Sequence, residues 1–141
     1  MKLVVDASVV AKCLVPETDT KRARKVLVLW AEARLDLMAP SILPSEIANM
    51  LWKRTRRNLL PVAEVGPLYT EFLGLRIPLV PADSLVEPAL KLALHYGHSV
   101  YDGLYLALAL QTGSDFLTAD ERLYNSVASA LPQVRRLGDW D

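Results

Sequence analysis

Two carboxylates in this sequence follow segments that are predicted to be buried strands. Asp6 comes directly after the aliphatic run Leu3–Val5, which suits a strand buried on both faces of a parallel sheet, and Asp120 closely follows Phe116–Thr118. The carboxyl ends of the strands form the edge of an open α/β sheet at which ligands bind. We therefore expect both side chains at one edge of the sheet, as neighbours if the two strands pair.

Two further carboxylates lie in the first turns of predicted helices. Glu46 belongs to a helix in which Leu43 and Met50 form part of the buried stripe, so its side chain should turn toward the sheet. Asp102 lies in the first turn of a helix that opens at Ser99. Four separate connections would thus bring four carboxylates to one edge.

Each carboxylate also has an ordinary structural explanation. Asp6 and Asp120 could cap the helices that follow them, and Glu46 could interact with a helix dipole. Asp102 fits a capping box with Ser99, three residues earlier. Together, however, these roles would crowd like charges, and two charges about 4 Å apart repel by roughly 1 to 4 kcal/mol. A divalent cation removes that penalty, and oxygen ligands favour Mg²⁺ or Mn²⁺.

Strand-like and helix-like segments alternate along the chain. The predicted strands cover residues 3–5, 37–39, 77–80, 116–118 and 134–137. The predicted helices cover residues 7–14, about 19–35, 42–58, 85–96, 100–112 and 121–128. Ser41 is a candidate cap for the third of these helices, and Gly66 and Pro67 should divide residues 61–75 into two short helices. This order predicts a three-layer α/β/α sandwich with a mainly parallel sheet of four or five strands, in which Pro78 favours an edge position for its strand.

Length, composition and charge favour a single small domain over residues 1–141. A hydrophobic content of 52% agrees with a compact fold, and 16 basic and 16 acidic residues leave no net charge. The single Cys13 and the lack of a charged-then-apolar leader favour a reducing cytoplasm. The longest apolar run, Leu104–Leu110, is too short to cross a bilayer, so no membrane association is expected.

Local positive charge is the feature that could attract a polyanion, because a cluster of carboxylates cannot. The best candidates for substrate binding share the helix of Glu46 and lie near its far end: Lys53, Arg54, Arg56 and Arg57. Basic residues in the segment Lys21–Lys25 form a second cluster. Either cluster could instead be a solvated helix face.

Four segments, in order and at compatible spacings, resemble those of PIN-domain nucleases. They are Val-Val-Asp-Ala-Ser at 4–8 with Lys12, Glu-Ile-Ala-Asn-Met-Leu at 46–51, Ser-Val-Tyr-Asp-Gly-Leu-Tyr-Leu-Ala-Leu-Ala at 99–109, and Phe-Leu-Thr-Ala-Asp-Glu-Arg-Leu at 116–123. The resemblance spans essentially the whole chain and is strongest to the VapC type, the toxin half of prokaryotic toxin-antitoxin pairs. The main local departure is Gly103, where the family more often has alanine; glycine there costs up to about 1 kcal/mol and leaves the chemistry in place.

The resemblance implies a site built from Asp6, Glu46, Asp102 and Asp120. One or two Mg²⁺ or Mn²⁺ ions, held mainly by the three aspartates, would polarise the scissile phosphate and activate a water for in-line attack, while Glu46 would hold a water or the second ion. Ser8 and Thr118 match small hydroxyl positions that support the site, and Asn49 matches a residue that orients Glu46 or the substrate.

The same resemblance implies an RNA substrate, products with a 5′-phosphate and a 3′-hydroxyl, and a cognate antitoxin whose arginine could enter the acidic site. Apolar surface on the helices of residues 63–75 favours a homodimer. Haloacid-dehalogenase phosphatases need a second Asp where this chain has Ser8, and response-regulator receivers need an acidic pair near the first strand. A catalytically inactive PIN-like module that binds RNA or protein is the alternative that stays open.

Overall fold

A parallel sheet of five strands forms the centre of the protein, whose residues 1–141 are all described by the computed structural model. The strands are β1 (Lys2–Val5), β2 (Asp36–Pro40), β3 (Leu79–Val80), β4 (Asp115–Thr118) and β5 (Val134–Arg136). They lie in the order β3-β2-β1-β4-β5, and every neighbouring pair is parallel. The first strand pairs with the fourth, with Val4 opposite Phe116, so the condition for Asp6 and Asp120 to be neighbours is met, and the third strand lies at an edge as expected.

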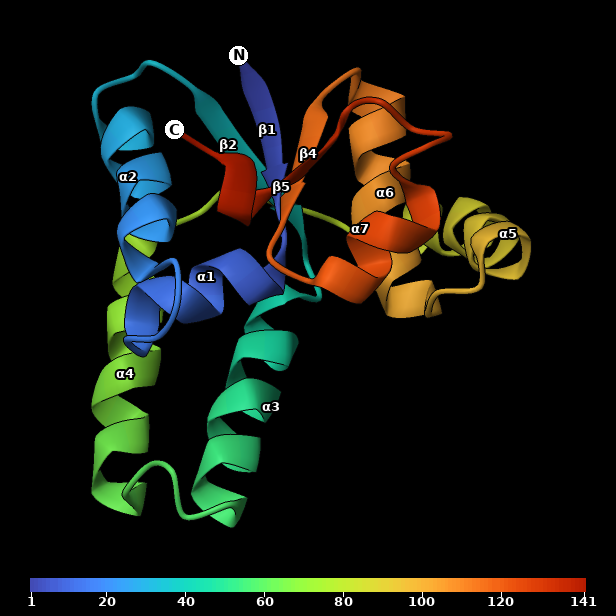
Figure 1. The fold of residues 1–141 in the computed structure, drawn as a ribbon. Coiled ribbons are helices and arrows are strands. Elements are labelled where there is room, and N and C mark those ends of the chain that lie inside the picture. Colours follow the sequence, from blue (N-terminus) through green and yellow to red (C-terminus); the bar gives the residue numbers. More distant parts are fainter.

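Seven α-helices surround the sheet. They are α1 (Ala7–Leu14), α2 (Thr20–Ala31), α3 (Leu43–Arg56), α4 (Val62–Leu75), α5 (Val86–Tyr96), α6 (Val100–Thr112) and α7 (Glu121–Val127). Figure 1 shows the sheet between α1 and α2 on one side and α5 and α6 on the other, which confirms the α/β/α sandwich, while α3 and α4 extend past the sheet as a pair. None of these helices has both the length and the apolar character needed to span a membrane.

The core lies where β1 and β4 pack against α6. Residues Leu3–Val5 are almost completely buried, as expected for a strand covered on both faces, and α6 is buried continuously from Gly103 to Ala109. On its other side α6 packs closely against α5, since a Cβ atom at Gly103 would lie 2.6 Å from the backbone oxygen of Ala89. The close contact therefore requires glycine at the position directly after Asp102.

The expected break within residues 61–75 is wrong, because α4 is one continuous helix. Pro67 lies inside it and removes one backbone hydrogen bond. The helix nevertheless buries Phe72 and packs Tyr69 against the core, where the two rings lie 5.7 Å apart. The burial of these aromatic side chains offsets the loss of a single hydrogen bond. Tertiary packing therefore overrides the tendency of Gly66 and Pro67 to break the helix.

The expected cap at Ser41 is also wrong. Its hydroxyl accepts a hydrogen bond of 3.0 Å from the amide of Ala82, which ties the end of β2 to the segment after β3. Helix α3 begins at Leu43 with Ile42 at the capping position and Pro44 in its first turn, where a proline costs no hydrogen bond. Helix α2 likewise ends at Ala31 rather than near residue 35.

Candidate active site at the carboxyl edge of the sheet

Asp6 is the most deeply buried charged side chain in the protein, with 5% of its surface exposed. It precedes α1, but its side chain makes no capping hydrogen bond to that helix. Its Oδ2 atom instead accepts hydrogen bonds of 2.7 Å from the hydroxyls of Ser8 and Thr118. The explanation of Asp6 as a helix cap is therefore wrong, because its carboxylate turns toward two hydroxyls inside the protein.

The two hydroxyls also bind the chain that leads to Asp120. The amide of Ala119 donates to Oγ of Ser8 at 2.9 Å, and the amide of Asp120 donates to Oγ1 of Thr118 at 3.0 Å. Each hydroxyl thus donates a hydrogen bond to Asp6 and accepts one from a backbone amide of the β4–α7 connection. This network fixes the carboxylate at the end of β1 relative to the backbone at the end of β4.

Asp102 and Asp120 partly fulfil the ordinary roles considered for them. Oδ1 of Asp120 accepts a hydrogen bond of 3.0 Å from the amide of Leu123 and caps α7. Oγ of Ser99 accepts a hydrogen bond of 3.1 Å from the amide of Asp102 and caps α6. Capping uses only one oxygen of Asp120, so the other remains available to a ligand.

Glu46 lies in the first turn of α3 and meets Tyr105, a residue to which the sequence analysis gave no role. Its Oε1 atom is enclosed and has no hydrogen-bond partner, and the same is true of the hydroxyl of Tyr105 on α6. The hydroxyl faces Glu46 closely enough to lower the pKa of that carboxyl, but the two groups form no hydrogen bond of ordinary geometry. The sequence signal that could have pointed to Tyr105 is its hydroxyl, which lies one helical turn after Asp102 within an otherwise apolar run.

Burial raises the pKa of three of these side chains. The pKa of Asp6 rises from 3.8 to about 7 because burial outweighs its two hydrogen bonds, and the charges of Asp102 and Glu46 raise it further. Burial also raises the pKa of Glu46, and the charge of Asp102 adds to that rise. It likewise raises the pKa of Asp102, and the charge of Asp120 adds to it. The structure thus brings the predicted carboxylates into one electrostatic neighbourhood, where each negative charge opposes ionisation of the next.

Metal binding can be tested against this donor set. No three of these side chains lie in an arrangement that holds a single ion. The chemistry of the set nevertheless fits a hard cation. All donors are carboxylate oxygens, Oε1 of Glu46 is buried without a partner, and burial, together with the neighbouring negative charges, raises the pKa values of Asp6 and Asp102. The ends of β1 and β4 and the first turns of α3 and α6 already bring the backbone of the four carboxylate residues together. To share one ion, their side chains would have to rotate.

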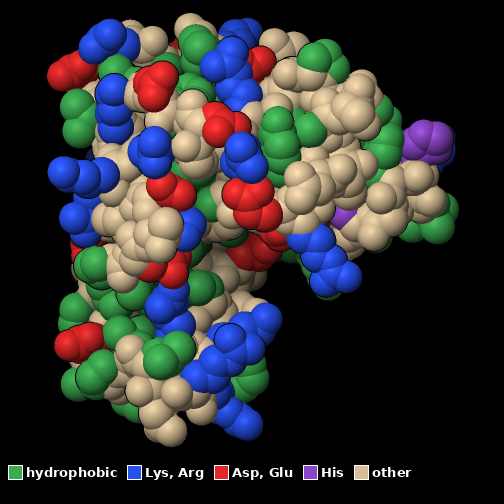
Figure 2. Space-filling view, viewed as in Figure 1, with side chains coloured by type: hydrophobic (Ala, Val, Ile, Leu, Met, Phe, Trp, Pro, Cys, Tyr) green, Lys and Arg blue, Asp and Glu red, His purple; other side chains and the backbone are tan.

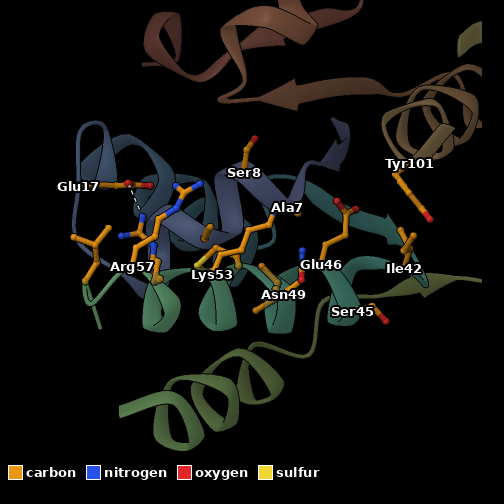
Figure 3. A pocket seen from close by; sticks show the side chains of 15 residues that line it. Ala7, Ser8, Glu17, Ile42, Ser45, Glu46, Asn49, Lys53, Arg57 and Tyr101 are labelled. Atoms are coloured by element: carbon orange, nitrogen blue, oxygen red, sulfur yellow. Dashed lines mark hydrogen bonds and ion pairs between the residues drawn. The ribbon is translucent and has the colours of Figure 1, made fainter. Parts of the chain in front are cut away.

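A groove of about 830 Å³ extends from Glu46 along α3. Figure 3 shows Glu46 near Tyr101 at one end and Arg57 near Glu17 at the other, with Asn49 and Lys53 between them on α3. Figure 2 shows acidic side chains at the inner corner where the α3–α4 pair meets the rest of the molecule, and basic side chains along the pair. The groove therefore runs from negative to positive surface.

The predicted basic cluster divides into paired and unpaired side chains. Lys53, Arg54 and Arg57 line the groove, but Arg54 forms an ion pair of 2.8 Å with Glu17. Arg56 does not line the groove, and its guanidinium lies 5.3 Å from the ring centre of Trp52. Lys53 and Arg57 form no ion pair within the chain, so they are the cations best placed for a polyanion.

Asn49 and the basic cluster on α2 lie differently with respect to the groove. Asn49 lines the groove on α3, three residues after Glu46, and its role toward Glu46 or the substrate stays a prediction. The basic cluster on α2 does not line the groove, and Arg22 binds Asp19 at 2.8 Å and the backbone oxygen of Trp140 at 3.0 Å. This cluster is part of the folded surface rather than of the candidate site.

Comparison with known proteins places the chain in a family. Residues 3–128 match the model of the PIN domain, so the chain belongs to the PIN-domain family. Within that family it is 38% identical over 128 residues to Ribonuclease VapC3 from Pyrobaculum aerophilum, covering 87% of this chain and 92% of that protein.

Solved structures of low sequence identity share the same fold. PAE2754 from Pyrobaculum aerophilum has a TM-score of 0.70 at 20% identity, covering 98% of this chain and 93% of that chain. VapC20 from Mycobacterium tuberculosis, described as a sarcin-ricin loop cleaving toxin, has a TM-score of 0.68 at 17% identity, covering 94% and 98%. VapBC2 from Rickettsia felis, bound to a promoter DNA fragment, has a TM-score of 0.66 at 13% identity, covering 100% of both chains. The fold implied by the sequence motifs is therefore confirmed.

Proposed function

We propose that this protein is a Mg²⁺- or Mn²⁺-dependent endoribonuclease that hydrolyses phosphodiester bonds in RNA. The observation that carries the proposal is the burial of Asp6 within reach of the charges of Asp102 and Glu46, of which Glu46 lines a groove that also contains unpaired Lys53 and Arg57. Such a site combines carboxylates for a cation with cations for a polyanion. The relationship to a protein described as a ribonuclease supports the same reaction.

Each group in the site would have a distinct task. The cation would be held mainly by Asp6, Asp102 and Asp120, with Glu46 holding a water or a second ion. A bound divalent cation would polarise the scissile phosphate and lower the pKa of the attacking water. Ser8 and Thr118 would keep the Asp6 carboxylate in one orientation through their hydrogen bonds of 2.7 Å.

The groove would bind the RNA strand next to the scissile phosphate. Lys53 and Arg57 would neutralise phosphates, and Asn49 would contact the strand from the same helix. Arg54 would contribute less, because Glu17 already neutralises its charge. By resemblance to the family, we infer that the attacking water displaces the 3′-oxygen of the ribose, which leaves a 5′-phosphate and a 3′-hydroxyl.

We also propose that the protein is the toxin of a toxin-antitoxin pair and acts in the cytoplasm, where its RNA substrate would be. Support comes from the VapC3 relative and from fold neighbours described as VapBC2 and as a toxin-antitoxin complex from Klebsiella pneumoniae. A homodimer is a further proposal. It is supported by the apolar side chains of Val62 and Leu73 on α4, which are 74% and 54% exposed.

A catalytically inactive PIN-like module that binds RNA or protein is the second candidate. One observation favours it, namely that no three acidic side chains are arranged to hold a single ion. It predicts binding of RNA or a partner without metal-dependent cleavage. The two candidates therefore differ in whether a divalent cation changes the RNA.

The test is an RNA cleavage assay with Mg²⁺, with Mn²⁺ and with EDTA. We expect the wild-type protein to cleave RNA only when a divalent cation is present, and Asp6→Asn and Asp102→Ala to be inactive. Asp36→Asn is the matched control, because Asp36 begins β2 at the opposite edge of the sheet and is exposed. Equal RNA integrity with wild type and both site variants under all conditions would favour the inactive module.

A further inference from the structure

Tyr105 is a fully buried tyrosine whose hydroxyl has no hydrogen-bond partner. It lies on α6 one turn after Asp102, and its ring packs 6.1 Å from the ring of Phe116 on β4. A phenylalanine ring would fill the same space without burying a hydroxyl. Since an unpaired buried hydroxyl costs free energy, packing alone does not account for this one.

The hydroxyl points into the acidic end of the site. Burial raises its pKa well above the ordinary tyrosine value, and the charges of Glu46, Asp6 and Asp102 raise it further. A tyrosine hydroxyl is protonated at neutral pH, so it can stabilise a carboxylate only by donating a hydrogen bond. Every charged group that acts on it is a carboxylate of the candidate site.

The matching acceptor is Oε1 of Glu46, which is also enclosed and unpaired. The second oxygen of Glu46, Oε2, is not enclosed in this way, and Glu46 lines the groove. Figure 3 shows the Glu46 side chain projecting from α3 toward the groove, between α3 and the start of α6 that carries Tyr101. A buried donor and a buried acceptor thus face each other across two helices, with one carboxylate oxygen left over for a ligand.

We propose that Tyr105 is a positioning residue whose hydroxyl binds Oε1 of Glu46 and thereby directs Oε2 toward the cation and the RNA. This hydrogen bond gives each of the two buried atoms the partner that it otherwise lacks. The bond also connects α3 to α6, so it sets the position of Glu46 relative to Asp102. The inference rests on the proposed function for its catalytic consequence, but its structural consequence can be measured separately.

The test compares Tyr105→Phe, Glu46→Gln and the double variant with the wild type. Tyr105→Phe should lower kcat for RNA cleavage and weaken Mn²⁺ binding, measured by calorimetry, each by about 10-fold or more, because residues that support ligands typically have effects of 10- to 100-fold. The KM for RNA should stay within about twofold. The double variant should be no less active than Glu46→Gln, because Tyr105 acts through Glu46.

Tyr69→Phe is the matched control, since Tyr69 is a partly buried tyrosine on α4 outside the candidate site. It should change neither kcat nor Mn²⁺ affinity. Wild-type kcat and Mn²⁺ affinity in Tyr105→Phe would overturn the inference, as would multiplicative losses in the double variant. Weaker Mn²⁺ binding in Tyr105→Phe, together with no RNA cleavage by the wild type, would support the positioning role and reject the ribonuclease.

A second measurement covers the case in which Tyr105→Phe does not fold. The ¹³C resonance of the carbon that bears the Tyr105 hydroxyl reports on its hydrogen bond, and Glu46→Gln should shift it because an amide oxygen accepts less strongly than a carboxylate. An unchanged resonance in Glu46→Gln would contradict the inference. A shift would support it without relying on the tyrosine variant.

Discussion

Replacing Asp6 with asparagine should stabilise the metal-free protein in a pH-dependent way while abolishing activity. Burial raises the pKa of Asp6 from 3.8 to about 7, so the folded state binds this proton more tightly than the unfolded state. Below about pH 4 the group is protonated in both states and costs nothing. As the pH rises from about 4 to 7 the unfolded chain loses the proton first, so the free energy of unfolding falls, and the full cost applies above pH 7.

The size of this cost follows from the change in proton affinity. A tenfold change in affinity is worth about 1.4 kcal/mol, so the rise in pKa from 3.8 to about 7 corresponds to about 4 kcal/mol above pH 7. An asparagine oxygen can still accept the hydrogen bonds from Ser8 and Thr118. Its amide group adds a buried donor, whose burial costs roughly 1 to 3 kcal/mol. We therefore expect a net gain of about 1 to 3 kcal/mol at pH 8.

The assay is urea unfolding of the wild type and of Asp6→Asn in EDTA between pH 4 and 8. The gain in stability should grow with pH and level off above pH 7, and Asp36→Asn should show no such trend. Adding Mg²⁺ should raise the stability of the wild type more than that of Asp6→Asn, because the cation stabilises the ionised carboxylate. An Asp6→Asn protein that is less stable than wild type at pH 8, or a difference that does not vary with pH, would refute the reasoning.

Three further predictions follow from the groove, the hydroxyl network and the α5–α6 contact. Lys53→Gln and Arg57→Gln should each reduce the slope of log K for RNA binding against log salt concentration by about one phosphate contact. Arg54→Gln should change this slope less, because Glu17 already pairs with Arg54. Equal slopes for all three variants would argue against this assignment. Thr118→Val should lower the free energy of unfolding by about 1 to 3 kcal/mol, measured in urea, because it leaves the amide of Asp120 without a partner and Asp6 with only the hydrogen bond from Ser8. Thr118→Ser should restore the free energy of unfolding. Gly103→Ala should reduce the melting temperature, because the added methyl group would lie 2.6 Å from a backbone oxygen of α5. Overpacking of this kind costs about 1 to 3 kcal/mol. An unchanged melting temperature would show that α5 moves freely.

The features that could be predicted from the sequence depend on local pattern and on the geometry of parallel sheets. The bounds of α6 match the expected 100–112, because Ser99 caps one end and Gly113 adopts the left-handed conformation at the other. Asp6 and Asp120 were placed at a common edge because each follows a predicted strand of a parallel sheet, and the structure has β1 and β4 adjacent. Such signals are encoded within a few residues and need no knowledge of long-range packing.

The features that could not be predicted depend on contacts between distant elements. Gly103 was interpreted as a helix position that alanine would fill better, but the backbone of α5 occupies the space of the added methyl group. Tyr105 has the same apolar neighbours in the sequence as a core residue, and only the placement of α3 beside α6 puts its hydroxyl next to Glu46. The division of the basic cluster likewise depends on Glu17, which lies 37 residues before Arg54.

The electrostatic cost at the carboxyl edge explains why so many polar contacts of this protein converge there. A buried carboxylate with a pKa of about 7 destabilises the fold at neutral pH, and the charges of Glu46 and Asp102 add to that cost. The hydroxyls of Ser8 and Thr118 lower it but do not remove it, since the pKa stays well above 3.8. A carboxylate held in this state gains more from a divalent cation than an exposed one would, because water solvates an exposed carboxylate already. The destabilisation of the free protein is therefore the physical basis for the expected preference of this edge for a cation.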